Sequence, residues 1–207
     1  ALGVHAEDAV RVDALLAGLG ASRRTPLVAM NVNASRLAFE RRWPRDRFAH
    51  IAARLSARFG AHVLLIGSAA ERDYAGALLG ELPHPAAVSN VAGRLSFGEL
   101  VALLDRSALL VTNDSGPLHV ASALDTPTVA LFGPETPARY GPLASRRLVL
   151  YAGLACSPCI SVQNRKTVSC NYDALCMRSI DVDTAWRSIE PFVADLARRP
   201  AAREVAG

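Results

Sequence analysis

The sequence predicts an α/β fold, in which a Rossmann-like, doubly wound parallel sheet is covered by helices on both faces. Short, continuously apolar runs alternate along the chain with longer segments of helical periodicity. Strands of this apolar kind are typical of parallel sheets buried between helices. The composition, 51% hydrophobic and 20% charged, is that of a globular protein, and 207 residues suffice for one ordinary domain.

Six segments are expected to form the strands. Each is a run of apolar or β-branched residues, and each is bounded by polar or turn-forming residues. The third run is shorter and more polar, so its strand is the weakest. In chain order the expected strands are Leu27–Val32, His62–Ile66, Val88–Val91, Ala108–Val111, Thr128–Phe132 and Leu148–Tyr151.

Helices are expected between these strands. One begins at Pro44, because proline suits the first helical turn, and ends at Gly60, because glycine tolerates the left-handed conformation there. Two Ser-x-x-Glu pairs have capping-box spacing and predict helix starts at Ser68 and Ser96. The remaining expected helices, of which the first and last should pack on the flanks of the sheet, are Glu7–Leu19, Pro117–Leu124 and Val182–Ala197.

The charge balance favours a small anionic ligand. The formal net charge is only +4, and of the 23 basic residues only Lys166 is a lysine. Arginine presents a planar fork that suits phosphates. Nucleic-acid binding is not expected, because it calls for clustered basic stripes and aromatic platforms, whereas aromatic residues make up 6%.

Nothing in the sequence predicts a membrane span or a secretory signal. The longest apolar runs are far too short to cross a bilayer. The first ten residues carry acidic side chains and lack the basic-then-apolar layout of a signal peptide. We therefore expect a cytoplasmic protein without a transmembrane segment.

The loop after the fourth expected strand carries the strongest chemical signal. It reads Asp114-Ser115-Gly116-Pro117, and His119 follows one turn into the next helix. Backbone N–H groups of Ser115 and Gly116 at a helix N-terminus would form an anion site. Asp114 would repel a phosphate but suits the hydroxyl groups of a sugar. A plain helix start explains the same residues and stays open as the alternative.

Two further loops lie at the same expected edge of the sheet. Asn33 and Ser35 precede Arg41-Arg42-Trp43-Pro44, and their hydroxyl and guanidinium donors suit a diphosphate. The alternative is a solvated basic loop over a packed tryptophan. Ser68 with Glu71 suits a ribose and Leu95 suits the rim of a flat base, although each also fits a plain helix start.

Together these loops resemble those of glycosyltransferase family 9, the lipopolysaccharide heptosyltransferase family. The resemblance extends over about Leu27 to Phe192. It implies one of the two Rossmann-like halves of a GT-B glycosyltransferase, an inverting mechanism that requires no metal or other cofactor, and an ADP-heptose-like donor. The blocks that carry it are Asn33-Ala-Ser35, Arg41-Arg42-Trp43-Pro44, Thr112–Ala121 and Leu131-Phe-Gly-Pro134.

The resemblance also implies roles for individual residues. Arg41 stands where heptosyltransferases usually carry lysine, so the basic charge is kept. The implied phosphate contacts are Ser35, Arg41, Ser115 and Gly116; the sugar contacts are Asp114 and His119; the nucleoside contacts are Ser68, Glu71 and Leu95.

In the family, the catalytic base and the acceptor site belong to an N-terminal half. We therefore expect residues 1–26 to be a leading helix and linker from that half. Residues 27–207 are expected to be the nucleotide-sugar-binding domain, with a cysteine-containing loop at 156–176 and a closing helix. No catalytic residue is expected in this chain. Alone it should be inactive, and the lipopolysaccharide-type acceptor, reached at the inner membrane face, would bind through the other half.

The four cysteines form two pairs, Cys156-Ser-Pro-Cys159 and, after a gap of ten residues, Cys170 and Cys176. The first pair has the C-x2-C spacing of metal ligands, whereas the second pair is wider than zinc sites usually allow. A structural zinc or other metal is one interpretation, and reduced thiols or a disulfide are the others.

Two other functions remain open at this point. One is a nucleotide-sugar epimerase, which shares the GT-B donor half. The other is a non-catalytic binding module that is stabilised by a metal at the four cysteines.

Overall fold

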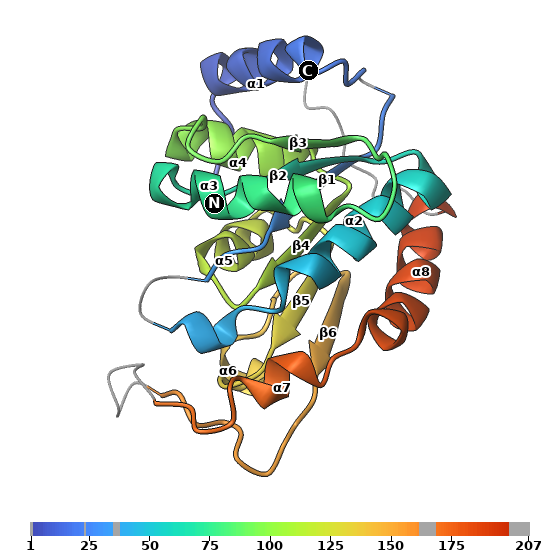
Figure 1. Ribbon diagram of the computed structural model, residues 1–207. Coiled ribbons are helices and arrows are strands. Elements are labelled where there is room, and N and C mark those ends of the chain that lie inside the picture. Colours follow the sequence, from blue (N-terminus) through green and yellow to red (C-terminus); the bar gives the residue numbers. More distant parts are fainter. Residues whose placement is uncertain (1, 23, 35–37, 162–168, 199–207) are drawn as a thin grey trace.

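The computed structural model describes residues 2–22, 24–34, 38–161 and 169–198. Its centre is a six-stranded parallel sheet in the order β3-β2-β1-β4-β5-β6, with helices on both faces (Figure 1). The register sets Val28 opposite Val63 on one side and Leu109 on the other. The strands are β1 (Leu27–Asn31), β2 (His62–Leu65), β3 (Val88–Asn90), β4 (Leu109–Asn113), β5 (Thr128–Phe132) and β6 (Arg147–Tyr151).

The helices follow the strands in the alternation that the sequence predicts. The α-helices are α1 (Ala6–Gly18), α2 (Arg45–Phe59), α3 (Arg72–Gly76), α4 (Phe97–Arg106), α5 (Gly116–Ala123), α6 (Pro137–Tyr140), α7 (Leu175–Arg178) and α8 (Val182–Arg198). The described residues also form short 3-10 helices, which are η1 (Phe39–Arg41), η2 (Ala69–Glu71) and η3 (Ala77–Glu81).

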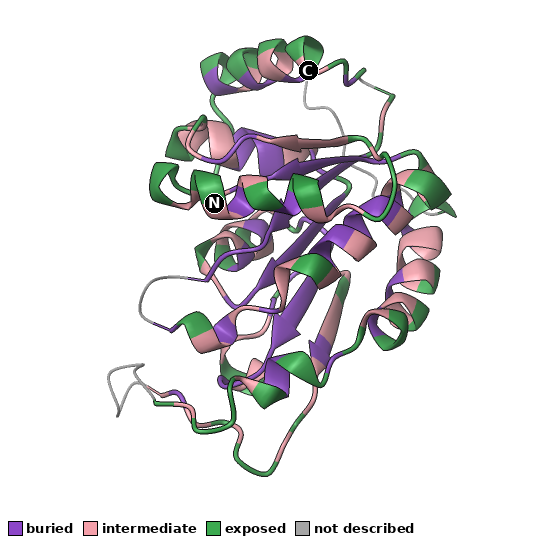
Figure 2. Cartoon of the chain, viewed as in Figure 1, coloured by how far each residue is buried: buried purple, intermediate pink, exposed green. Residues whose placement is uncertain are grey.

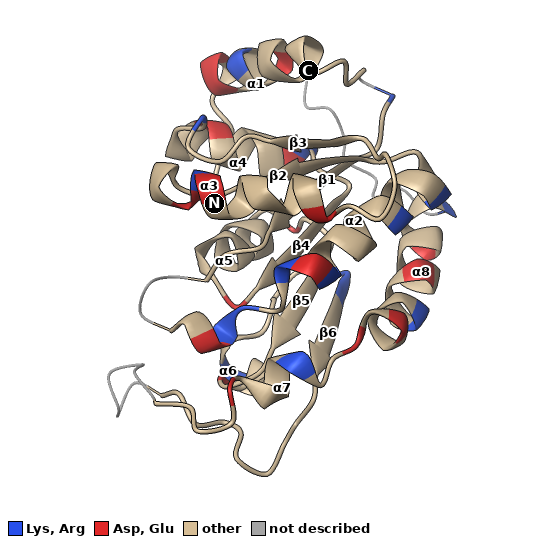
Figure 3. Cartoon of the chain, in the orientation of Figure 1, with Lys and Arg blue, Asp and Glu red and all other residues tan. Residues whose placement is uncertain are grey.

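Successive side chains of each strand point to opposite faces of the sheet, so each strand contributes to two cores. Val28 and Met30 pack with α2, α7 and α8 on one face, whereas Leu27 and Ala29 pack with α1, α4 and α5 on the other. The central strands β1, β2, β4 and β5 are accordingly buried, the edge strands β3 and β6 are mostly half-buried, and the outer sides of the helices are exposed (Figure 2). Charged residues of both signs alternate over these helices and the loops (Figure 3).

The first and last helices pack on the flanks of the sheet, as the sequence predicts. Val12 and Leu16 of α1 are buried against α4. On the other side, α8 covers α2, and ion pairs join Arg54 to Asp183 and Arg58 to Glu190. Helix α1 therefore packs into the same domain as the sheet. The expectation that residues 1–26 form a linker from another half stays a prediction.

The predicted fold class is confirmed, and so are all six strands, with small shifts at their ends. Both capping boxes are also confirmed, at Ser68 and at Ser96. Helix α5 begins at Gly116, one residue before the predicted start, because Ser115 has the extended backbone of an N-cap. The short helices α6 and α7 interrupt segments that the sequence predicts as loops.

None of the helices in the described part of the chain combines the length and the apolar character that crossing a bilayer demands.

Candidate functional site

The strand order places a crevice at the carboxyl ends of β1 and β4. From β1 the chain proceeds to β2 and β3 on one side, and from β4 it proceeds to β5 and β6 on the other. In open parallel sheets, ligands bind at such a switch point, where the connections diverge. Asn31 is the last residue of β1 and Asn113 the last of β4, so two buried amides stand at the base of this crevice.

A network of buried amides holds the crevice together. The Asn31 side chain donates from Nδ2 to Oγ of Ser115 at 2.8 Å and accepts from the backbone N–H of Asn33 at 3.2 Å. Asn113 Nδ2 donates to the carbonyl of Asn33 at 3.2 Å, and its Oδ1 accepts from the backbone N–H of Trp43 at 3.0 Å. The loops after β1 and β4 are therefore fixed to each other by side chains that come from the strand ends.

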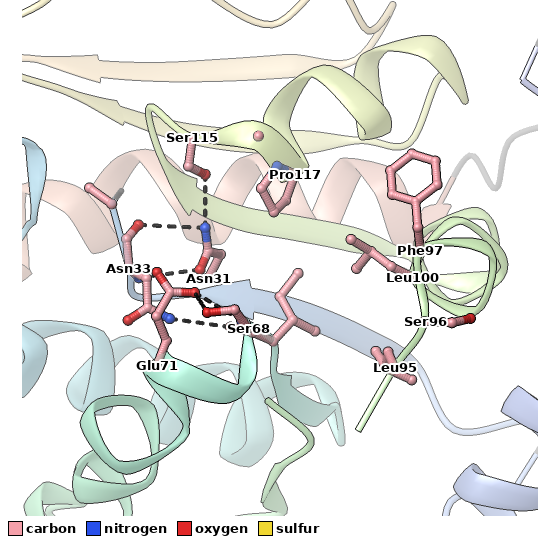
Figure 4. Close-up of a pocket in the computed structure, with 14 residues that line it drawn as sticks. Asn31, Asn33, Ser68, Glu71, Leu95, Ser96, Phe97, Leu100, Ser115 and Pro117 are labelled. Atoms are coloured by element: carbon pink, nitrogen blue, oxygen red, sulfur yellow. Dashed lines mark hydrogen bonds between the residues drawn. The ribbon is translucent and has the colours of Figure 1, made fainter. Parts of the chain in front are cut away.

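A pocket of about 350 Å³ opens above this network (Figure 4). The loops that follow four strands, β1 to β4, supply its walls. Glu71 is the one charged side chain among the described residues that line it. The lining residues are Asn31, Asn33, Ala34, Ile66, Gly67, Ser68, Glu71, Leu95, Ser96, Phe97, Leu100, Ser115, Gly116 and Pro117.

One wall of the pocket is acidic and rigid. Glu71 Oε2 accepts hydrogen bonds from the backbone N–H of Ser68 at 2.9 Å and from its hydroxyl at 2.8 Å. Gly67 lies next to the Asn33 amide and the Glu71 carboxylate. A Cβ at this position would be 2.8 Å from Asn33 Nδ2 and 3.3 Å from Glu71 Oε2. This glycine therefore lets the Asn33 amide and the Glu71 carboxylate lie side by side.

The opposite wall is apolar. Leu95, Leu100 and Pro117 lie along it, and Phe97 at the start of α4 leaves 64% of its surface exposed. An exposed phenylalanine beside half-buried aliphatic side chains forms a flat apolar rim (Figure 4). Such a surface suits one face of a planar ring.

The N-terminus of α5 closes the third side of the pocket. Ser115 and Gly116 line it, and Ser115 Oγ also lies 2.9 Å from the hydroxyl of Thr112. The first N–H groups of an α-helix have no partner within the helix, and the helix dipole adds positive potential there. This end of α5 can therefore hold an anion beside the acidic and apolar walls.

The structure brings five of the nine sequence-predicted donor-site residues into the lining of one pocket: Ser68, Glu71, Leu95, Ser115 and Gly116. Arg41 and Asp114 lie beside it, buried, with Arg41 Nη1 at 3.1 Å from Asp114 Oδ2. His119 lies on α5 and is exposed. Ser35 lies outside the described residues. Any contacts of these residues with a ligand stay predictions.

Sequence reasoning missed the importance of several lining residues. Asn31 and Asn33 were part of a polar loop in the sequence, but nothing in their spacing indicated a buried network. Phe97 and Leu100 carried a weak signal, because an apolar residue at the exposed start of an amphipathic helix is unusual. Their neighbour Leu95 was the residue that the resemblance indicated.

All four cysteines belong to the described residues, and none of them forms a disulfide bond. Cys156 is exposed and Cys176 is buried, with the other two between these extremes. Over the described part of the chain, no three His, Cys, Asp or Glu side chains already stand close enough to hold a metal ion. The metal interpretation therefore stays a prediction.

A family model for glycosyltransferase family 9 (heptosyltransferase) matches residues 6–168. The chain belongs to glycosyltransferase family 9. This match covers α1 and all six strands of the sheet. It also covers the loops at the crevice between β1 and β4, which carry the sequence resemblance.

Curated relatives of this family 9 chain include lipopolysaccharide heptosyltransferases. Heptosyltransferase 2 of Salmonella typhimurium is 38% identical over 112 residues, which are 53% of this chain and 32% of the relative. Heptosyltransferase 1 of Pseudomonas aeruginosa is 36% identical over 118 residues, 57% of this chain and 32% of the relative. The match thus spans about a third of the length of these curated relatives.

Solved structures confirm the fold. The family 9 glycosyl transferase of Veillonella parvula superposes with a TM-score of 0.74 at 27% identity, over 94% of this chain and 53% of that chain. The ADP-heptose lipopolysaccharide heptosyltransferase II of E. coli superposes with a TM-score of 0.72 at 22% identity, over 95% and 54%. This chain therefore has the fold of about half of a GT-B glycosyltransferase.

Proposed function

We propose that this chain is the nucleotide-sugar-binding domain of a heptosyltransferase. The enzyme would transfer heptose or a similar sugar from an ADP-sugar to a lipopolysaccharide-type acceptor. The observation that carries the proposal is the pocket at the β1–β4 crevice, which joins an acidic wall, an apolar wall and the N-terminus of α5. A related E. coli heptosyltransferase, WaaC, is described as bound to ADP, which supports the choice of nucleotide.

The three walls suit the three parts of a nucleoside diphosphate. The Glu71 carboxylate accepts hydrogen bonds from the ribose hydroxyl groups, and Leu95 and Phe97 contact the adenine ring. The N–H groups of Ser115 and Gly116 hold the phosphates. The remaining assignments follow the family resemblance: Ser35 and Arg41 toward the phosphates, Ser68 toward the ribose, and Asp114 and His119 toward the sugar.

In this proposal the domain accelerates the reaction by stabilising the leaving group. As the bond between the sugar and the diphosphate breaks, negative charge grows on the departing nucleotide. The N-terminus of α5 and the guanidinium donors of Arg41 favour that charge, and such stabilisation is strongest where the charge develops in the transition state. The step needs no metal, and the base that takes the acceptor proton belongs to the other half.

Because the acceptor site and the base lie elsewhere, we expect this chain alone to bind donor but not to transfer sugar. Loss of positioned reactants forfeits roughly 7–11 kcal/mol of barrier reduction, and loss of the base a further factor of about 10²–10⁴. Transfer of sugar by the 207-residue chain alone, at the rate of a complete enzyme, would contradict the proposal that the other half supplies the acceptor site and the base.

Calorimetry tests the donor proposal directly. The chain is titrated with ADP, UDP and GDP, and then with ADP-heptose. We expect ADP to bind better than the other two nucleotides and ADP-heptose to bind at least as well as ADP. If none of the four ligands binds at millimolar concentration, the proposal is wrong. Preference for UDP or GDP would show that the donor carries a nucleobase other than adenine.

A further inference from the structure

A second cavity lies at the edge of the sheet opposite to the nucleotide pocket. It has a volume of about 490 Å³ and lies at the amino ends of β1 and β4, which begin at Leu27 and Leu109. The last turns of α2 and α8 form its sides, through Phe59 and Leu196. Its volume is within the range of about 300–1,000 Å³ that is common for small-molecule sites. None of the described residues lines both cavities.

The floor of this cavity is aliphatic. Val28 and Leu109 come from the sheet, Leu55 comes from α2 and Leu196 comes from α8. Each of these residues has at most 9% of its surface exposed. A floor of this kind binds a ligand by removing apolar surface from water, which favours a hydrocarbon chain.

The uncharged polar side chains of the lining, Thr25 and Ser107, are already hydrogen-bonded within the protein. Ser107 Oγ donates to the carbonyl of Leu103 at 2.7 Å, and Thr25 Oγ1 accepts from the backbone N–H of Ser22 at 3.1 Å. A sugar or a nucleobase needs free partners for its polar groups, because burying those groups without a hydrogen bond is costly. A hydrocarbon chain has no such requirement.

The charged side chains of the lining are all cationic. They are Arg24, Arg106 and Arg146, and none of the described Asp or Glu residues lines the cavity. Asp13 pairs with Arg106 and Asp195 pairs with Arg146, so these two arginines are held in place. Arg24 is exposed and forms no ion pair with a described residue. The cavity therefore opens beside one uncompensated guanidinium, whose planar fork suits a carboxylate.

We propose that this cavity binds a fatty-acid anion, with the carboxylate at Arg24 and the acyl chain between α2 and α8. The aliphatic floor supplies the affinity, because the burial of each CH₂ group is favourable. The guanidinium of Arg24 selects an anionic head group over a neutral or a cationic one. The nucleotide pocket has the opposite character, since its charged side chain is the acidic Glu71.

Calorimetry with ligands of graded length tests the proposal. The full chain is titrated with octanoate, decanoate and dodecanoate, each below the concentration at which it forms micelles. We expect one equivalent to bind, and the affinity to rise by roughly threefold to fourfold for each added CH₂ until the cavity is filled. Octylammonium has the same chain length as octanoate and the opposite charge. It should bind at least roughly tenfold more weakly.

Two variants separate the contribution of the charge from that of the cavity. Arg24→Gln changes an exposed residue, so the fold is kept, and it should weaken dodecanoate binding by roughly threefold. Ala197→Trp places a large ring at an exposed position of the lining and should prevent binding of all three acids. The matched controls are Arg139→Gln and Ala123→Trp, which change exposed residues outside the lining and should leave binding unaltered.

ADP is titrated beside the fatty acids, so that the two proposals fail separately. A chain that binds dodecanoate but not ADP would contradict the proposed function alone. A chain that binds ADP but not dodecanoate would contradict the fatty-acid site alone. Equal affinities for octanoate and octylammonium would also overturn the fatty-acid site.

Sedimentation of the full chain identifies other occupants of the cavity. A dimer that Ala197→Trp dissociates would assign the cavity to a second copy of the chain. A monomer that takes up none of the three acids would leave the cavity to the chain's own residues after Arg198. Either result would overturn the fatty-acid site.

Discussion

Arg41 Nη1 lies 3.1 Å from Asp114 Oδ2, and the two side chains are only 8% and 7% exposed. The residues that the family resemblance assigns to phosphate and to sugar are thus partners of each other. The pairing answers a difficulty in the sequence, because Asp114 alone would repel a phosphate held at Ser115. Paired with Arg41, the carboxylate is neutralised, and the N-terminus of α5 stays attractive to an anion.

Because the Arg41–Asp114 pair is buried, Asp114→Asn should lower the stability of the fold as well as the affinity for the donor. The amide removes the negative charge from the buried pair with Arg41, and breaking a buried ion pair costs about 3–5 kcal/mol. We expect that loss in urea unfolding of the variant. Glu190→Gln, the same chemical change in the exposed pair with Arg58, should cost less than about 1 kcal/mol. Similar losses for both variants would show that burial does not set the strength of the Arg41 pair.

Glu71→Gln should weaken nucleotide binding. If the carboxylate accepts hydrogen bonds from the ribose, its loss costs roughly 1.5–3 kcal/mol of ADP affinity in calorimetry, the range for bonds to charged groups. The matched control is Glu99→Gln, which removes the corresponding carboxylate from the capping box of α4, outside the pocket. Both variants lose a capping interaction, but only the first should lose affinity. Equal affinities would assign Glu71 to capping alone.

Gly67→Ala should distort the acidic wall. The added Cβ would lie 2.8 Å from Asn33 Nδ2, so the amide must move and the pocket must change shape. Overpacking of this kind typically costs about 1–3 kcal/mol of stability, and we expect ADP affinity to fall as well. Gly80→Ala introduces the same methyl group where no atom lies within 4 Å, and it should change neither quantity. Unaltered ADP binding by Gly67→Ala would show that the wall tolerates displacement.

His62 should make the fold sensitive to mild acid. Burial at the start of β2 lowers the pKa of its imidazole below the ordinary value of 6.5, and its Nε2 lies 2.9 Å from the hydroxyl of Ser89. The unfolded chain therefore takes up this proton first as the pH falls. Stability from the neutral ring is present above about pH 6.5 and is lost as the pH decreases toward the folded-state pKa.

The measurement for His62 is urea unfolding between neutral and mildly acidic pH. The wild-type chain should lose stability steadily over this interval, and His62→Gln should remove a part of that slope. Identical slopes for the two chains would mean that His62 carries none of the pH dependence.

Much of the fold was predictable because it depends on local patterns. The β5 run Thr128–Phe132 is apolar throughout and can only be a buried strand, and the spacing of Ser96 and Glu99 sets the start of α4. The loop that contains Asp114 and Ser115 was predicted as the centre of the site for a similar reason. A buried strand that runs directly into polar residues and a helix start places them at the ligand edge of a parallel sheet.

By itself, the sequence determined the fold class, the six strands and the loops at which a ligand would bind, since hydrophobic periodicity and capping signals act over a few neighbouring residues. Only the tertiary structure decided which of those loop residues meet. Arg41 and Asp114 are 73 positions apart, and nothing near either one indicates its partner. Likewise Cys176 lies against Gly133 only because α7 packs on β5. Such contacts depend on how the strands are ordered and on how the helices cover them, and that arrangement is set by burial of the whole core rather than by local sequence.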